Sequence, residues 1–357
     1  MIPAGVPIQR PADARLLVVD ESGHVTHHRR ADFPRFVRRG DLLVANDAAT
    51  LPASLSGVHV PTGSRIELRL AARRSLVPRD VTNFTAVAFG EGDFRTPTER
   101  RPLPPSFAPG DRLRLGPLRA QVQRVHDHPR LIDVLFHGSA AEIWEGLARY
   151  GRPIQYAYVP EPLRIWDTWT RFANAPVAFE APSAGFMLDW RTIDTLRRQG
   201  ATFATITHAA GISSTGDPHL DARLPWDEPY DIPASTAARL AAARRRGGRI
   251  IAVGTTVVRA LEDAAGRDTP IRTGPAIATL RVGRDTPLRI VDAIVSGQHE
   301  HGTSHYELLR AFQSDEVLRH VVREADLHEY RMHEFGDSLL ILKQTGASRV
   351  VDGTAAA

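Results

Sequence analysis

A histidine-rich stretch, Ser296–His305, lies between a predicted strand and a predicted helix. It reads SGQHEHGTSH, and its three histidines and one glutamate are residue types that can bind a metal ion. The alternatives are a substrate-binding loop, with His299 as a hydrogen-bond donor or a general base, and a solvated polar loop. Because His-x-His spacing is common and no other cluster of ligands stands out, we expect a substrate-binding loop and no metal site.

A second stretch, Arg249–Glu262, reads RIIAVGTTVVRALE and predicts a buried strand, a turn at Gly254 and a helix. Either Thr255 or Thr256 could cap this helix with its hydroxyl. The first backbone N–H groups of a helix have no partner within it, so a carboxylate or a phosphate could bind there. An ordinary strand–helix connection would show the same pattern.

A third stretch, Glu180–Phe186, reads EAPSAGF and precedes a predicted helix. Its proline and its glycine predict a tight bend. Ser183 offers a hydroxyl close to helical N–H groups, and we count Ser183, Ala184 and Gly185 among the candidate binding residues. A simple helix cap is the structural alternative.

A fourth stretch, Tyr330–Asp337, precedes the last predicted strand. Arg331 could form an ion pair with Asp337, or it could bind the carboxylate of a substrate. The sequence contains no Walker loop, no G-x-G-x-x-G at a strand–helix turn and no G-x-S-x-G elbow.

Alternating polar and apolar residues mark a separate region between residues 56 and 137. Period-two segments recur there with turn signals between them, at 64–70, 82–89, 112–115, 119–125 and 131–136. Several short alternating strands without a long helix indicate an antiparallel barrel or sandwich. We interpret residues 56–137 as an inserted β-barrel domain.

Helices alternate with short apolar strands in the rest of the chain, which indicates an α/β domain with a mainly parallel or mixed sheet. This domain would be discontinuous and consist of residues 1–55 and 138–357. The expected strands include residues 201–208 and 288–295, and a long loop is expected at 209–233.

Composition limits the classes of protein. The chain of 357 residues has no cysteine, which excludes disulfides, thiolate zinc sites and a cysteine nucleophile. Lys343 is its one lysine, so lysine Schiff-base chemistry is nearly excluded. The net charge of +4 permits a nucleic-acid partner, although arginine-rich coding explains it better. We expect a cytoplasmic protein, monomeric or homodimeric, without a transmembrane helix or a signal peptide.

Five motifs follow one another along the chain: GDLLVAND at 40–47, APSAGF at 181–186, AVGTTVVRALE at 252–262, His299 before GTSHYELLRAF, and YRMHEFGDSLLI at 330–341. In order and spacing they resemble the S-adenosylmethionine:tRNA ribosyltransferase-isomerases of queuosine biosynthesis. The resemblance covers about residues 10–342. It implies an α/β domain interrupted by a β-barrel, which agrees with the division above.

The resemblance also implies a reaction. The ribosyl part of S-adenosylmethionine would move to the aminomethyl group of a 7-deazaguanine in tRNA, adenine and methionine would leave, and an epoxycyclopentanediol would form. S-adenosylmethionine is then a substrate, and no cofactor is expected. The sulfonium acidifies the C5′ protons, so a base must reach C5′ and an acid should help adenine leave. Acid/base candidates are His299, His208 and Glu228; binding candidates are Ser183, Ala184, Gly185, Gly254, Thr255, Thr256, Arg259, Tyr230 and Arg331.

The chain departs from the family pattern at several positions. Ala48-Ala49 stand where the family has Thr-Arg, Ser54 replaces an arginine, and Phe186-Met-Leu188 replaces Leu-His-Phe. Of the family's glycine-rich LHVGxGTF loop and its M-H-S-E-W-Y motif, this chain keeps only His208, Glu228 and Tyr230. These changes keep two other hypotheses open: an enzyme that uses S-adenosylmethionine or a related nucleoside with a small-molecule acceptor, and a non-catalytic binding protein.

Overall fold

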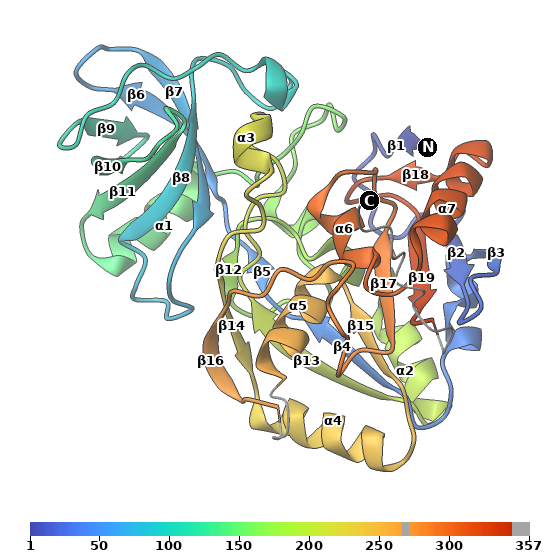
Figure 1. The fold of residues 1–357 in the computed structure, drawn as a ribbon. Coiled ribbons are helices and arrows are strands. Elements are labelled where there is room, and N and C mark those ends of the chain that lie inside the picture. Colours follow the sequence, from blue (N-terminus) through green and yellow to red (C-terminus); the bar gives the residue numbers. More distant parts are fainter. Residues whose placement is uncertain (266–270, 345–357) are drawn as a thin grey trace, which may run out of the picture.

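A nine-stranded mixed sheet forms the centre of the molecule in a computed structural model that describes residues 1–265 and 271–344 (Figure 1). Its strand order is β16-β14-β13-β4-β15-β17-β19-β2-β3. The strands are β2 (Arg15–Val19), β3 (Val25–Arg29), β4 (Leu42–Asn46), β13 (Thr202–His208), β14 (Glu228–Ile232), β15 (Ile250–Val253), β16 (Gly274–Ala278), β17 (Ala293–Gly297) and β19 (Ser338–Leu342). The four central strands β13, β4, β15 and β17 are parallel.

Both faces of this sheet are covered, and strand β4 shows how. Its side chains alternate between the faces, as a strand requires. Leu42 and Val44 pack against one set of helices, and Leu43 and Ala45 pack on the opposite face. The first face is covered by α4 (Ala234–Arg245), α5 (Thr255–Ala264), α6 (Ser304–Leu309) and α7 (Asp315–Leu327). The second is covered by α2 (Trp190–Arg198) with the 3-10 turns η1 (Arg30–Phe36) and η4 (Ser183–Met187).

A closed six-stranded antiparallel barrel interrupts the sheet domain (Figure 1). Its strands are β6 (Ser54–His59), β7 (Arg65–Ala72), β8 (Asn83–Phe89), β9 (Arg112–Leu115), β10 (Leu118–Val125) and β11 (Leu131–His137). The predicted fold class, a mixed α/β domain with a β-barrel insert, is therefore confirmed.

The helix that follows the barrel belongs to the barrel's core. Helix α1 (Ala140–Tyr150) begins with the predicted capping box of Ser139 and Glu142. Its Ile143 and Leu147 pack in the same apolar cluster as the barrel strands, although the sequence assigns them to the α/β domain. That independent domains end at residues 56 and 137 stays a prediction. Residues 266–270 and 345–357 lie outside the described part.

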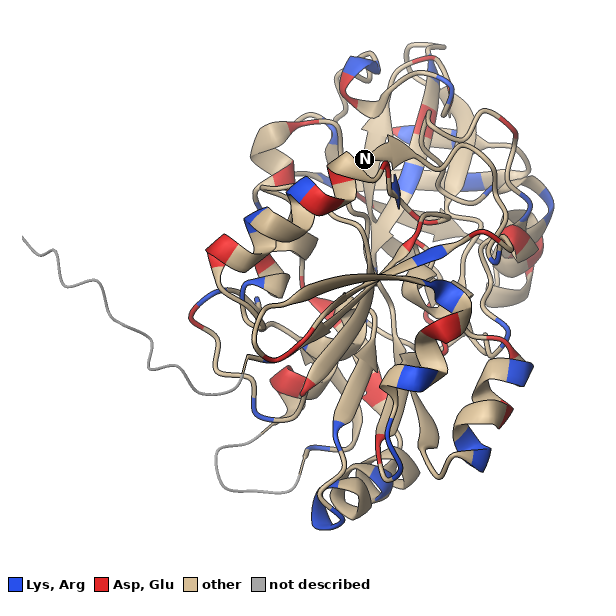
Figure 2. Ribbon diagram, turned by 90° about the vertical axis from the view of Figure 1, so that its right-hand side faces the viewer, with Lys and Arg blue, Asp and Glu red and all other residues tan. Residues whose placement is uncertain are grey.

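Short elements complete the fold. The remaining ones are β1 (Ile2–Pro3) with β18 (Arg331–Met332), β5 (Ala49–Thr50) with β12 (Pro176–Ala178), α3 (Pro218–Asp221), η2 (Thr98–Arg100) and η3 (Ile165–Asp167). No helix among the described residues is long and apolar enough to span a bilayer. Basic and acidic residues are interspersed over the side of the molecule shown in Figure 2.

Two expectations about strands were wrong. The strand predicted at 288–295 begins only at Ala293, because the Glu262 carboxylate accepts hydrogen bonds from the backbone amides of Arg289, Ile290 and Val291. The loop predicted at 209–233 contains strand β14, which pairs with β13 and β16.

A buried charge cluster lies on the outer face of barrel strand β7, opposite the face from which Ile66, Leu68 and Leu70 fill the barrel core. Glu67 and Arg69 are two residues apart on β7 and therefore point to the same side. The Arg69 Nε donates to Glu67 Oε1 at 2.9 Å, and Arg101 donates to the other carboxylate oxygen. Burial raises the pKa of Glu67, but the charges of Arg69 and Arg101 outweigh it, so the pKa is lowered. The carboxylate is thus ionised and balances two buried guanidinium groups.

Replacing Glu67 by glutamine should destabilise the protein by about 3–5 kcal/mol, because it leaves two guanidinium groups buried without a counter-charge. The measurement is denaturant unfolding. Glu91→Gln is the matched control, since Glu91 pairs with Arg65 on the barrel surface and both are mostly exposed. The control should change stability by less than about 1 kcal/mol. Equal effects of the two substitutions would contradict the assignment.

Candidate active site

A cavity of about 310 Å³ opens at the carboxyl ends of β13, β15 and β17, where ligands bind in open α/β sheets. Its walls come from the loop after β13, the β15–α5 turn, the stretch after β17 and the turn at η4. Of the residues predicted from the sequence, the structure brings together at this cavity Ser183, Ala184, Glu228, Gly254, Thr255, Thr256, Arg259 and His299.

The amino terminus of helix α5 forms one wall. Gly254 precedes the helix with φ of 101°, a conformation that favours glycine, and its carbonyl begins the helical hydrogen bonding. The prediction that a threonine hydroxyl caps this helix was wrong, because Thr255 and Thr256 are already its first two residues. Their backbone N–H groups have no acceptor within the helix and carry its positive end, so this wall favours an anion.

A buried carboxylate lies behind this wall. Glu228 Oε2 is 2.9 Å from His208 Nε2 and 2.5 Å from Arg259 Nη1, and Gly211 donates its amide to Oε1. The net pKa of Glu228 is lowered, although burial alone would raise it. The lowering comes from the hydrogen bond and charge of His208, the charge of Arg259 and the Gly211 amide. Glu228 is therefore ionised.

Arg259 and His208 connect this carboxylate to the surrounding backbone. Arg259 also donates to the carbonyls of Trp226, Ala278 and Leu280. The His208 Nδ1 lies 2.8 Å from the Thr256 carbonyl oxygen. His208 is fully buried, so it can position Glu228 and helix α5 but does not itself reach the cavity.

His299 is a neutral imidazole in the cavity wall. Its Nε2 lies 2.7 Å from the Ser296 hydroxyl oxygen, and its ring stacks on His305 with centroids 4.9 Å apart. Burial, followed by repulsion from His305 and His333, holds the pKa of His299 well below its usual value. At neutral pH this side chain can accept a proton or a hydrogen bond.

Glu180 is a titratable cavity residue that the sequence prediction missed. It accepts hydrogen bonds from the Tyr156 hydroxyl and, at 3.0 Å, from the Ser213 amide. Burial raises the pKa of Glu180 to about 7 despite these donors, so its carboxyl group is half protonated near neutrality. Its place beside the bend at Ser183 was the available signal; its burial was not visible in the sequence.

Besides His208, three predicted residues lie away from the cavity wall. Gly185 is buried against Phe172 and Thr170. The Tyr230 hydroxyl donates to Asp263 at 3.0 Å within the core. Arg331 pairs with Asp337 and Asp13, which is the structural alternative that the sequence offered. Roles in binding for these residues stay predictions, as do the catalytic roles of His299, His208 and Glu228.

The cavity thus combines a helix terminus suited to an anion with a neutral imidazole and a carboxyl group that titrates near pH 7, features that are typical of an enzyme active site. A family model described as "Queuosine biosynthesis protein" matches residues 2–341. The chain belongs to this family.

Similar proteins carry a common name. The chain is 32% identical over 352 residues to the S-adenosylmethionine:tRNA ribosyltransferase-isomerase of Gloeobacter violaceus, covering 95% of this chain and 93% of that one. It is 30% identical over 362 residues to the protein of the same name from Azoarcus, covering 96% and 95%. The crystal structure of S-adenosylmethionine tRNA ribosyltransferase from Thermotoga maritima matches with a TM-score of 0.49 and 22% identity, covering 96% and 95%.

The neutral state of His299 makes stability depend on pH. Because its pKa is lowered on folding, the unfolded chain binds a proton that the folded chain does not, and the free energy of unfolding falls as the pH drops below about 6.5. His299→Gln should flatten this decline by up to about 1.4 kcal/mol per pH unit. Urea unfolding between pH 7 and 5 measures it, with His301→Gln on the exposed part of the loop as control. Identical slopes for wild type and His299→Gln would refute the prediction.

Proposed function

We propose that this protein is an S-adenosylmethionine:tRNA ribosyltransferase-isomerase. It transfers the ribosyl part of S-adenosylmethionine to 7-aminomethyl-7-deazaguanine in tRNA and isomerises it to an epoxycyclopentanediol, releasing adenine and methionine. The family membership and the names of the relatives support this proposal. The observation that carries it is the cavity, which offers an anion-binding helix terminus, a neutral base and a protonated acid together.

The donor would bind with its methionine carboxylate at the start of helix α5. The Thr255 and Thr256 amides supply hydrogen-bond donors, and the helix dipole adds a favourable charge. Ser183 and Ala184 face this turn from η4, and the space above Gly254 is narrow, since a Cβ there would lie 3.5 Å from the Ala184 Cβ. The sulfonium of the donor activates its own ribose, so the proposed reaction uses no resident cofactor.

Two side chains are suited to the proton transfers. His299 is neutral and can accept the C5′ proton that the sulfonium acidifies. Glu180 remains protonated up to about pH 7 and can donate to the adenine as it leaves. Glu228, held ionised by Arg259 and His208, positions the helix α5 wall rather than exchanging protons.

The relatives' names, which give tRNA as a substrate, support tRNA as the acceptor over a small molecule. Five of the departures from the family pattern lie away from the cavity. The side chains of Ala48 and Ala49 are fully buried, and Phe186, Met187 and Leu188 are at most 6% exposed. These five residues do not line the cavity, whereas Ala210, Gly211 and Gly297, which lie in other stretches that depart from the family pattern, do. Because tRNA is the proposed acceptor, the proposed place of action is the cytoplasm.

The direct test incubates the purified protein with S-adenosylmethionine and tRNA that carries the 7-aminomethyl-7-deazaguanine base. We expect adenine and methionine to be released in equal amounts, and only with this tRNA. The control is the same tRNA with guanine at that position. Adenine release without any dependence on tRNA would favour a small-molecule acceptor, and absence of donor binding by calorimetry would refute both donor-based readings.

Glu180→Gln tests the proposed acid. It should lower kcat by roughly 10²–10⁴-fold while donor binding measured by calorimetry changes little. In the wild type kcat should fall above about pH 7, where Glu180 loses its proton, and the variant should lose this dependence. Glu300→Gln, which alters an exposed carboxylate next to His299, is the matched control. A wild-type pH profile in Glu180→Gln would exclude the role.

A further inference from the structure

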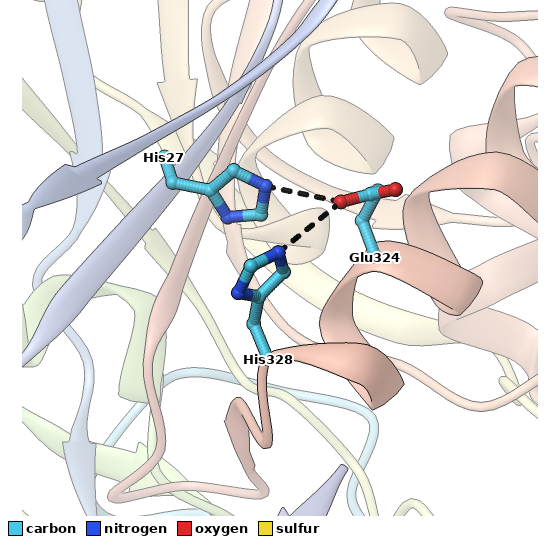
Figure 3. Close-up of side chains that lie close together, drawn as sticks. All are labelled: His27, Glu324 and His328. Carbon is cyan, nitrogen blue, oxygen red and sulfur yellow. Dashed lines mark hydrogen bonds and ion pairs between the residues drawn. The ribbon is translucent and has the colours of Figure 1, made fainter.

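A second cluster of donor side chains lies away from the cavity, between edge strand β3 and helix α7 (Figure 3). His27 Nε2 is 3.2 Å from Glu324 Oε2, and His328 Nε2 is 3.5 Å from the same oxygen. Three potential ligand atoms, one from each residue, all lie within 4.8 Å of one another. The side chains are between a quarter and a half exposed, so an ion could enter from solvent.

These distances fit a shared metal ion. With metal–ligand bonds of about 2.1 Å, neighbouring ligand atoms of a tetrahedral zinc site are roughly 3.4 Å apart. The two measured separations of 3.2 and 3.5 Å lie on either side of that value. Two imidazoles with one carboxylate also form a ligand set that zinc commonly adopts.

The surroundings hold the two imidazoles in place. The second ring nitrogen of His27, Nδ1, is 3.0 Å from the hydroxyl of buried Tyr330, and such a partner fixes the orientation of a metal-binding histidine. Arg15 donates to the backbone carbonyls of His328 and Glu329 at 2.5 Å each, which fixes the end of α7. The Arg15 charge is itself paired with Asp337.

Helix α7 places two histidines, His320 and His328, next to Glu324. His320, Glu324 and His328 are spaced by four residues, so they lie on one face of the helix. His320 Nδ1 is 3.9 Å from Glu324 Oε1. One carboxylate is thus approached by three histidines, counting His27 from the neighbouring strand.

We propose that His27, Glu324 and His328 bind one divalent transition-metal ion, zinc by its ligand preference, with the fourth position open to water. The ion connects edge strand β3 to helix α7 and so stabilises this edge of the sheet. The site shares no residue with the cavity, and its role is structural. It is a metal site where the sequence predicted none, and its histidines come from two distant parts of the chain.

Calorimetric titration of ZnCl₂ into the chelator-treated full chain tests the proposal, together with thermal unfolding with and without zinc. We expect one zinc per chain and a rise in Tm of at least about 2 °C. His27→Ala and Glu324→Gln should each weaken binding at least about tenfold and abolish the rise. His24→Ala is the matched control, because it removes another exposed histidine of the same hairpin.

Cobalt can be used as a spectroscopic probe of the coordination geometry at this site. Co²⁺ in place of zinc should show the strong visible absorption of a tetrahedral site in the wild type, and His328→Gln should lose it. Absence of zinc binding by the wild type would overturn the proposal, as would unchanged affinity in His27→Ala and Glu324→Gln. If one variant fails to fold, the other two still decide the outcome.

Discussion

The carboxylate of Glu228 is the contact on which the cavity depends. It lies on β14 and joins His208 on β13, Arg259 on α5 and the amide of Gly211. A buried charge is costly unless it is paired and hydrogen-bonded. The Glu228 carboxylate meets both conditions, because it is paired with Arg259 and hydrogen-bonded to His208 and Gly211. Because Arg259 also binds three backbone carbonyls, the start of α5 is held at a fixed distance from the end of β13.

The same arrangement recurs wherever the fold needs a fixed junction. Asp41 binds Arg249 where β4 and β15 begin, Glu67 binds two arginines on the outer face of the barrel, and Glu262 binds three successive amides before β17. Arginine suits these positions because its planar group donates several hydrogen bonds in fixed directions, which the compact ammonium of lysine does not. The nearly complete use of arginine as the basic residue therefore has structural consequences, whatever its origin.

Local patterns predicted much of this fold. Period-two alternation identified five of the six barrel strands and missed β6, and the strand–Gly–Thr-Thr–helix pattern located the cavity wall at Gly254. The failures involve partners distant in sequence. The apolar segment 288–295 resembles a strand throughout, but Glu262 binds its amides. Strand β14 was missed because it contains Pro229, which has no backbone N–H; in the structure Pro229 takes part in the pairing through its carbonyl, which accepts from the Ala209 amide. The burial that shifts the pKa of Glu180, and the approach of His27 to Glu324 across 297 residues, exist only in the folded chain.

The order of strands in the sheet dictates when each part of the chain can fold. The barrel strands all lie between residues 54 and 137 and pair with one another, so the barrel can form while later residues are still being synthesised. Strand β4 instead waits for β13 and β15, more than a hundred residues later, and β2 waits for β19 near the end of the chain. The nascent protein must therefore keep its earliest apolar strands from aggregating until β19 has left the ribosome.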